Sequence, residues 1–301
     1  MRNFHNRMLR REIREGTFAY LIITPALLLI LGLVLYPIGY AIYMTFFKTD
    51  LLKAGNEFLG LQQYVAVLTD RAFWSSLGIT VYFTVLSLIV QTILGIAIAL
   101  LLNLKFKGRG IMRGLVLAPW AVPTVVNAQL WGWIYQASYG ALNKILLKIG
   151  LISAPVVWLG TANRALNMII LADTWRMTPL YVVMFLAGLQ TISPDLREAA
   201  LIDGAGSFKR LRYIILPLLQ PMMFVVLILR TMQALRVFDI VYLLTQGGPN
   251  SGTMVISYYA YFKTFKALDF GYGSTIGLIV AILTIMICLL YKRVLQHEDS
   301  Y

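Results

Sequence analysis

The sequence predicts an all-α membrane protein with six transmembrane helices, from its composition, the length of its uncharged windows and their lack of strand-like alternation. Of the 301 residues, 59% are hydrophobic and only 13% are charged, whereas soluble domains usually carry about 25% charged residues. The uncharged windows are long enough for membrane-crossing helices, which need about 20 apolar residues. These windows are too continuously apolar for the strands of a membrane barrel, which alternate apolar and polar residues and need only about 10 residues.

Six windows with few or no ionisable residues define the expected spans. Their residue ranges are 18–47, 72–104, 114–143, 165–190, 213–229 and 270–291. The fifth span is expected to continue as a helix to about residue 239. Pro119 and Pro123 lie near the start of the third span, and proline inside a helix predicts a kink.

The distribution of positive charge predicts that both termini lie in the cytoplasm. With the N-terminus inside, the inner segments carry 15 Lys and Arg residues and the outer segments carry 8, as the positive-inside rule requires. The chain then divides into a cytoplasmic N-terminal arm (1–17), a six-helix transmembrane domain (18–293) and a cytoplasmic tail (294–301). The net charge of +13 is therefore explained by topology. Nucleic acid is not an expected partner, because the chain has no soluble basic domain.

The residue types needed for several kinds of catalytic site are scarce. The single cysteine, Cys288, lies in the last apolar window, and the two histidines, His5 and His297, lie near the termini. We therefore expect no disulfide, no metal site and no histidine-based catalysis. No ATP-binding G-x4-G-K-S/T loop and no G-x-S-x-G motif occur, so we expect no cofactor and no enzymatic activity in this chain. The first apolar window is too long for a cleavable signal peptide.

A polar segment, residues 193–217, separates the fourth and fifth windows and predicts a compact helix–turn–helix, here called the knuckle, facing the cytoplasm. Ser193 is expected to cap a first helix over 195–202, and Gly204 allows the turn that follows. Ser207 is expected to cap a second helix that runs toward the membrane. These residues fit both an ordinary connecting loop and a docking element for another protein.

Ionisable residues inside the fourth and fifth spans predict a polar surface within the membrane, because such residues usually face protein or water. Asp173 and Arg176 are three positions apart and can pair on one face of a helix. Polar residues recur at every third position of the fifth span and would form a ribbon along one side of that helix. They are Arg230, Gln233, Arg236 and Asp239.

This polar set could line a wet cavity for a sugar, because Arg and Asp supply donors and acceptors for hydroxyl groups. Aromatic rings could stack on the apolar face of the sugar. The expected platforms are Trp131, Trp133, Trp175 and Tyr181. The alternative is that the charges form structural ion pairs or contacts to a partner subunit.

The spacing E-A-A-x3-G-x9-I-x-L-P over residues 198–217 resembles the signature loop of permease subunits of binding-protein-dependent ABC importers. Residues 58–64 resemble the segment that precedes the second span in this family. Residues 173–175 with Pro179, and residues 244–249 followed by Thr253, resemble its carbohydrate-importing branch, especially maltose and trehalose permeases. The resemblance implies a type I ABC importer permease fold in the inner membrane and a disaccharide such as trehalose or maltose as substrate. The alternative interpretation is that the substrate is glycerol phosphate. An integral membrane enzyme would need a set of catalytic residues, and none is apparent. A secondary transporter would need paired repeats and an ion site of its own, and neither is apparent.

The resemblance also implies partners and residue roles. The partners would be a second permease subunit, two ATP-binding subunits that carry ATP and Mg, and an extracytoplasmic sugar-binding protein, with membrane lipid around them. The knuckle would be the loop that couples to the ATPase, with roles for Glu198, Ala199, Ala200, Asp203 and Gly204. The substrate pathway would include Asp173, Arg176, Met177, Arg230, Gln233, Arg236 and Asp239.

Overall fold

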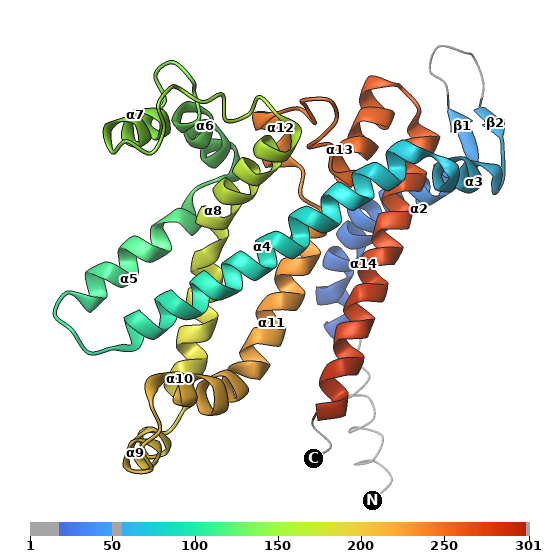
Figure 1. Cartoon of the computed structure of the whole chain (residues 1–301). Helices are drawn as coiled ribbons and strands as arrows, with labels where there is room; N and C mark the ends of the chain where they lie inside the picture. Colours follow the sequence, from blue (N-terminus) through green and yellow to red (C-terminus); the bar gives the residue numbers. More distant parts are fainter. Residues whose placement is uncertain (1–17, 50–55, 299–301) are drawn as a thin grey trace, which may run out of the picture. The chain divides into compact units, whose positions relative to one another are not determined.

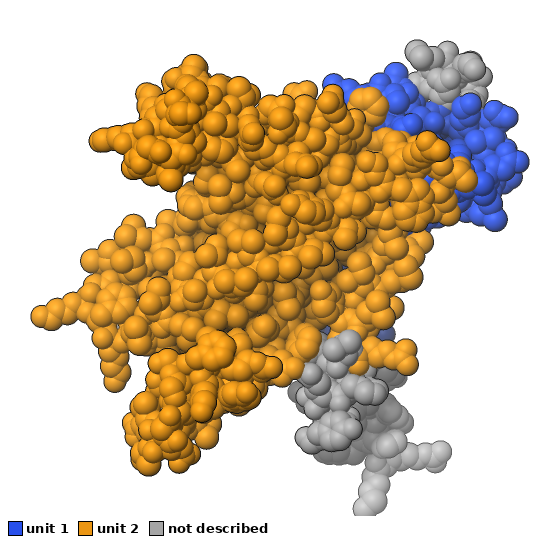
Figure 2. All heavy atoms as spheres, viewed as in Figure 1, with its two compact units in different colours: residues 1–67, 263–278 blue, residues 68–262, 279–301 orange. Residues whose placement is uncertain are grey.

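The computed structural model describes residues 18–49 and 56–298, which form two compact units, shown in Figures 1 and 2. Unit 1 comprises residues 1–67 and 263–278, and unit 2 comprises residues 68–262 and 279–301. The expected N-terminal arm (1–17) and the last residues of the expected tail (299–301) lie outside the described residues. Both units consist mainly of helices, so the predicted fold class is confirmed.

Unit 1 contains the first expected span. It is a helix over Phe18–Met44 that includes a π-helical stretch, η1 (Ile30–Leu35), and ends as α2 (Tyr36–Met44). Pro37 lies two residues after η1 within this continuous helix, where a proline removes one backbone hydrogen bond. Unit 1 also holds most of α3 (Gln62–Thr69), most of η4 (Phe262–Lys266) and the first turns of α14 (Phe270–Glu298).

A small sheet in unit 1 departs from the purely helical prediction. Strands β1 (Phe47–Thr49) and β2 (Asn56–Phe58) pair antiparallel, with Phe47 opposite Phe58. Each strand has three residues, which is too short for the alternation that would predict a strand from sequence.

Unit 2 contains the remaining described spans and the elements between them. Three long helices, α4 (Arg71–Asn103), α8 (Ala162–Thr191) and α11 (Leu216–Leu235), pack against one another. The C-terminal part of α14 also belongs to this unit. The shorter elements are α5 (Arg109–Leu117), η2 (Ala118–Ala121), α6 (Thr124–Ile134), α7 (Ala141–Lys148), α9 (Pro194–Ile202), α10 (Ser207–Arg210), η3 (Leu211–Ile215), α12 (Asp239–Leu244) and α13 (Ile256–Tyr261).

The third expected span is broken sharply instead of kinked. Its two helical parts, Arg109–Ala121 and Thr124–Ile134, meet at 99°. Pro119 lies in η2 and Pro123 directly precedes α6, and proline both lacks a backbone donor and disfavours helix in the residue before it. The expected end at residue 143 is also too late, because α7 is a separate helix. Five helices of the described chain are long and apolar enough to cross a membrane, and the bent pair makes six.

The fifth span ends earlier than the sequence predicts. The helical run Ser207–Leu235 stops before Arg236, and a new helix, α12, begins at Asp239. Between them, Val237 is buried in a hydrophobic cluster that includes Tyr258, and the partly buried Phe238 packs against that cluster. This tertiary contact competes with continuation of the helix. The spacing of the polar residues does not depend on it and therefore cannot predict the break. The expected continuous ribbon therefore spans two helices and the break between them.

Gly95 lets α4 and α8 approach closely. A Cβ added at Gly95 would lie 2.5 Å from Cβ of Tyr181 and 3.3 Å from the ring of Phe185, and both aromatic side chains are fully buried. Small residues serve this purpose where helices pack inside membranes.

We expect Gly95→Ala to destabilise unit 2 by about 1 to 3 kcal/mol, because the added methyl group overpacks the interface. Gly78→Ala on the same helix is the matched control, since nothing lies within 4 Å of its added Cβ and alanine is about 1 kcal/mol better than glycine in a helix. Thermal unfolding in detergent measures both variants. Equal melting temperatures would contradict the close approach.

Candidate functional site

A polar cavity of about 330 Å³ lies within unit 2 among α8, α11 and the start of α12. Its wall contains every residue that the sequence analysis assigned to the substrate pathway, although these residues come from different helices. They are Asp173, Arg176, Met177, Arg230, Gln233, Arg236 and Asp239. The rest of the wall is Trp120, Thr124, Val237, Phe238 and Ile240. The structure brings the predicted residues together, and their role in binding stays a prediction.

A buried ion pair between Asp173 and Arg230 joins α8 to α11 at this cavity, and the two side chains are only 5% and 3% exposed. Gln91 of α4 completes the network: its Nε2 donates to Oδ2 of Asp173 at 3.0 Å, and its Oε1 accepts from Nε of Arg230 at 2.9 Å. Buried charges need both a partner and hydrogen bonds. The triad of Asp173, Arg230 and Gln91 meets both conditions and ties three helices together.

The expected pairing of Asp173 with Arg176 is wrong. A spacing of three positions makes such a contact possible, but Asp173 pairs with Arg230 of another helix. Among the described residues, the buried Nε of Arg176 has no hydrogen-bond partner. A buried donor left without an acceptor is costly. Arg176 is therefore a candidate to contact a ligand in the cavity that it lines.

The cavity carries a small excess of positive charge. Its wall holds three arginines and two aspartates, and the Asp173–Arg230 pair cancels within it. The remaining charges of the wall are the two positive charges of Arg176 and Arg236 and the one negative charge of Asp239. Nε of Arg236 donates to the Met232 carbonyl at 3.1 Å, which uses one of the five donors of its guanidinium. Such a wall offers more donors than acceptors, a set that sugar hydroxyls can satisfy because they both donate and accept.

Sequence reasoning missed Gln91 of the ion-pair network and five residues of the cavity wall, which are Trp120, Thr124, Val237, Phe238 and Ile240. Gln91 is an amide near the middle of a long apolar helix, and an isolated polar group in such a place is a usable signal. Trp120 lies in η2, between Pro119 and Pro123 in the sequence. Its position depends on the angle at which the third span is broken, and the sequence does not predict this angle.

The four aromatic residues expected as stacking platforms do not line the cavity. Trp131 and Trp175 pack edge to face, with ring centroids 6.1 Å apart. Tyr181 is fully buried against Phe185. Trp120 is thus the tryptophan placed to stack on a ligand in this cavity.

The knuckle forms the two helices that its sequence predicts, α9 and α10. Oγ of Ser193 accepts from the backbone N–H of Asp195 at 3.2 Å, which confirms Ser193 as the cap of α9. Gly204 makes the turn with φ of 72°, a left-handed conformation that favours glycine. The expected cap at Ser207 is wrong, because Ser207 is the first residue of α10 and its Oγ accepts from Nη2 of Arg210 at 3.2 Å.

Most of the knuckle residues that the resemblance singles out are exposed. Glu198, Ala199, Asp203 and Gly204 are exposed, whereas Ala200 is buried. In Figure 1, α9 and α10 lie at one end of unit 2, and α6 and α7 lie at the other. The exposed carboxylate of Glu198, which two alanines follow in the sequence, is accessible to a partner protein.

Comparison with known families matches residues 91–299 to the family described as binding-protein-dependent transport system inner membrane component. The trehalose/maltose transport system permease protein MalF of Thermococcus litoralis is 44% identical over 283 residues, which cover 94% of this chain and 95% of that protein. The sulfoquinovosyl glycerol transport system permease protein SmoG of Agrobacterium fabrum is 34% identical over 289 residues, covering 96% and 93% of the two chains.

A solved structure shares the fold. It is a chain of a bacterial ABC transporter involved in the import of the acidic polysaccharide alginate, with a TM-score of 0.81 and 24% identity. The match covers 96% of this chain and 98% of that chain. The fold of this chain has therefore been observed experimentally.

Proposed function

The chain belongs to the family of binding-protein-dependent transport system inner membrane components, and on this premise we propose that it is a permease subunit of an ATP-driven sugar importer. It is a multi-pass protein of the cytoplasmic membrane. Its relatives are transport permeases and not enzymes, so the enzyme alternative has no support. The observation that carries the proposal is a polar cavity among the spans of unit 2, combined with the exposed Glu198 of the knuckle at one end of that unit.

The proposed substrate is a disaccharide such as trehalose or maltose. The name of the 44% identical relative supports this choice, and so does a cavity wall that combines guanidinium, carboxylate and amide groups with Trp120. The volume of about 330 Å³ is at the lower end for small-molecule sites, which suits a pathway completed by a second subunit. Glycerol phosphate is the second candidate, because the cavity has more arginines than carboxylates and guanidinium groups bind phosphate well.

We further propose how the subunit assembles. A second permease subunit would complete the pathway, two ATP-binding subunits would carry ATP and Mg, and an extracytoplasmic protein would deliver the sugar. Both termini and the knuckle would face the cytoplasm, with the arm 1–17 and the tail 294–301 on either side of the domain 18–293. Glu198 would pair with a basic group of the ATPase, Ala199 and Ala200 would allow close packing, and Asp203 and Gly204 would shape the turn.

The test is the ATPase activity of the reconstituted complex with its binding protein, measured with trehalose, maltose and glycerol phosphate in turn. We expect stimulation by trehalose or maltose. Stimulation by glycerol phosphate alone would reassign the cavity arginines to an anion site. If none of the three stimulates ATP hydrolysis, the proposed substrate class is wrong.

Trp120→Ala should raise the sugar concentration needed for half-maximal transport by about 2- to 10-fold, because stacking on an aromatic ring contributes about 0.5 to 1.5 kcal/mol. Trp120→Phe should restore most of the affinity, since it keeps a ring. Trp133→Ala is the matched control, because Trp133 is exposed on α6 and does not line the cavity. An equal effect of Trp120→Ala and Trp133→Ala would remove Trp120 from the site.

A further inference from the structure

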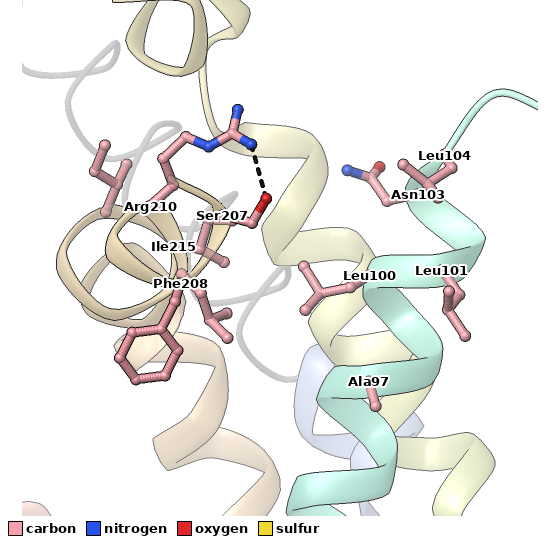
Figure 3. A pocket seen from close by; sticks show the side chains of 11 residues that line it. Ala97, Leu100, Leu101, Asn103, Leu104, Ser207, Phe208, Arg210 and Ile215 are labelled. Carbon is pink, nitrogen blue, oxygen red and sulfur yellow. Dashed lines mark hydrogen bonds between the residues drawn. The ribbon is translucent and has the colours of Figure 1, made fainter. Parts of the chain in front are cut away.

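An apolar groove of about 720 Å³ lies within unit 2 between α4 and the second half of the knuckle, as Figure 3 shows. One wall is the last two turns of α4, and the other is formed by α10 and η3. The apolar lining consists of Ala97, Leu100, Leu101, Leu104, Phe208, Leu211, Ile214 and Ile215. The sugar pathway described above shares no residue with this groove.

Polar groups gather at the end of the groove where α4 stops and α10 begins. Asn103, Ser207 and Arg210 line it there. Figure 3 shows Nη2 of Arg210 donating to Oγ of Ser207, at 3.2 Å. This bond uses one of the five N–H donors of the guanidinium. The groove thus changes along its length from hydrocarbon lining to a cationic end.

The chain segments around the groove are uniformly basic. Residues 97–110 and 205–215 together contain six Lys and Arg residues and no Asp or Glu. They are Lys105, Lys107, Arg109, Lys209, Arg210 and Arg212. A positive cluster of this size at the end of a transmembrane helix attracts anionic lipid headgroups, with about 1 kcal/mol per basic residue.

We propose that this groove binds one phospholipid with an anionic headgroup, whose acyl chain lies between α4 and η3 and whose phosphate meets Arg210. The dimensions agree. Residues 97–104 rise about 10 Å along α4, and one leaflet of hydrocarbon is about 15 Å thick, so the groove can hold most of one chain within its leaflet. The lipid would bridge α4 to the knuckle, and the coupling of ATP hydrolysis to transport should therefore depend on anionic lipid.

The first test measures lipid retained by the purified full complex after transfer from vesicles of equimolar phosphatidylglycerol and phosphatidylcholine, using native mass spectrometry. We expect one tightly held phosphatidylglycerol, and about fivefold weaker retention in Arg210→Gln. Lys148→Gln is the matched charge control, since Lys148 is exposed on α7 of the same unit and belongs neither to the basic cluster nor to the groove. An equal loss of phosphatidylglycerol in the two variants would show that the lipid is held by the general surface charge and would overturn the proposal.

Filling the groove tests the acyl chain separately. Leu101→Trp should displace the lipid, whereas Ile93→Trp on the same helix should not, because Leu101 and Ile93 are 62% and 63% exposed but only Leu101 lines the groove. Sugar-stimulated ATPase activity should then lose its dependence on phosphatidylglycerol in Leu101→Trp alone. Retention of the lipid by Leu101→Trp would overturn the proposal.

A photocrosslinking residue distinguishes a lipid from a protein occupant. With Leu101 replaced by photoleucine, a diazirine analogue of about the same size that leaves the groove open, irradiation of the assembled complex should yield an adduct with phospholipid. An adduct with the second permease or an ATP-binding subunit would show that the groove is a subunit interface and would overturn the lipid proposal. Neither outcome depends on which sugar the complex imports.

Discussion

Glu198→Arg is expected to abolish sugar-stimulated ATP hydrolysis and transport, with at least a 30-fold loss of activity. Glu198 is exposed on α9 and is proposed to meet a basic group of the ATPase subunit. Removing one member of a charge pair buried at an interface costs about 2 to 5 kcal/mol, and an arginine adds repulsion. Co-purification of the ATPase with tagged permease measures assembly, and ATPase activity with the binding protein measures coupling.

The matched control is the same charge reversal at Glu57, an exposed residue of β2 that lies across from Lys48. Exposed ion pairs contribute about 0 to 1 kcal/mol, so Glu57→Arg should leave assembly and transport near the wild-type level. Glu198→Gln should fall between the two, because it keeps a polar side chain and adds no like charge. Wild-type activity in Glu198→Arg would mean that the knuckle is an ordinary connecting loop.

The parts of the fold that the sequence predicts are those governed by long-range composition or by local chemistry. Uncharged windows locate the helices Phe18–Met44, α4, α8 and α14, because each reflects the need to satisfy the backbone inside lipid. Ser193 and Gly204 predict the start and end of α9, because a capping oxygen and a left-handed turn are decided by a few neighbouring residues.

Tertiary contacts decide what the sequence does not reveal. The two prolines of the third span indicate a disturbance, but the angle of 99° depends on packing. The break after Leu235 places Val237 inside a hydrophobic cluster that includes Tyr258, and the partly buried Phe238 packs against this cluster. Asp173 has a possible partner three positions away, yet it pairs with Arg230 because α4 supplies Gln91 to complete the network. Seven residues of the cavity wall are predicted from the sequence, whereas the other wall residues and the hydrogen bonds and ion pair that connect the site are not.

Asp173→Ala should lower the free energy of unfolding by about 3 to 5 kcal/mol, because it leaves Arg230 as an uncompensated buried charge. Arg230→Ala should have a similar effect by isolating the carboxylate. Thermal unfolding of the purified permease in detergent measures both. The loss of stability alone would also abolish transport, so these single variants do not distinguish a structural ion pair from a substrate contact.

An apolar replacement of the whole triad separates the two roles. Combining Asp173→Leu, Gln91→Leu and Arg230→Met removes both charges and the amide together, and replacing buried ion pairs with apolar groups of similar volume is often neutral or stabilising. We expect this variant to unfold near the wild-type temperature and to assemble with its partners, but to lose sugar transport. Because Arg176 and Asp239 remain in the wall, any residual binding would report their contribution. Normal transport by the triple variant would assign Asp173 and Arg230 to stability alone and leave Arg176, Arg236 and Asp239 as the remaining candidates for sugar contact.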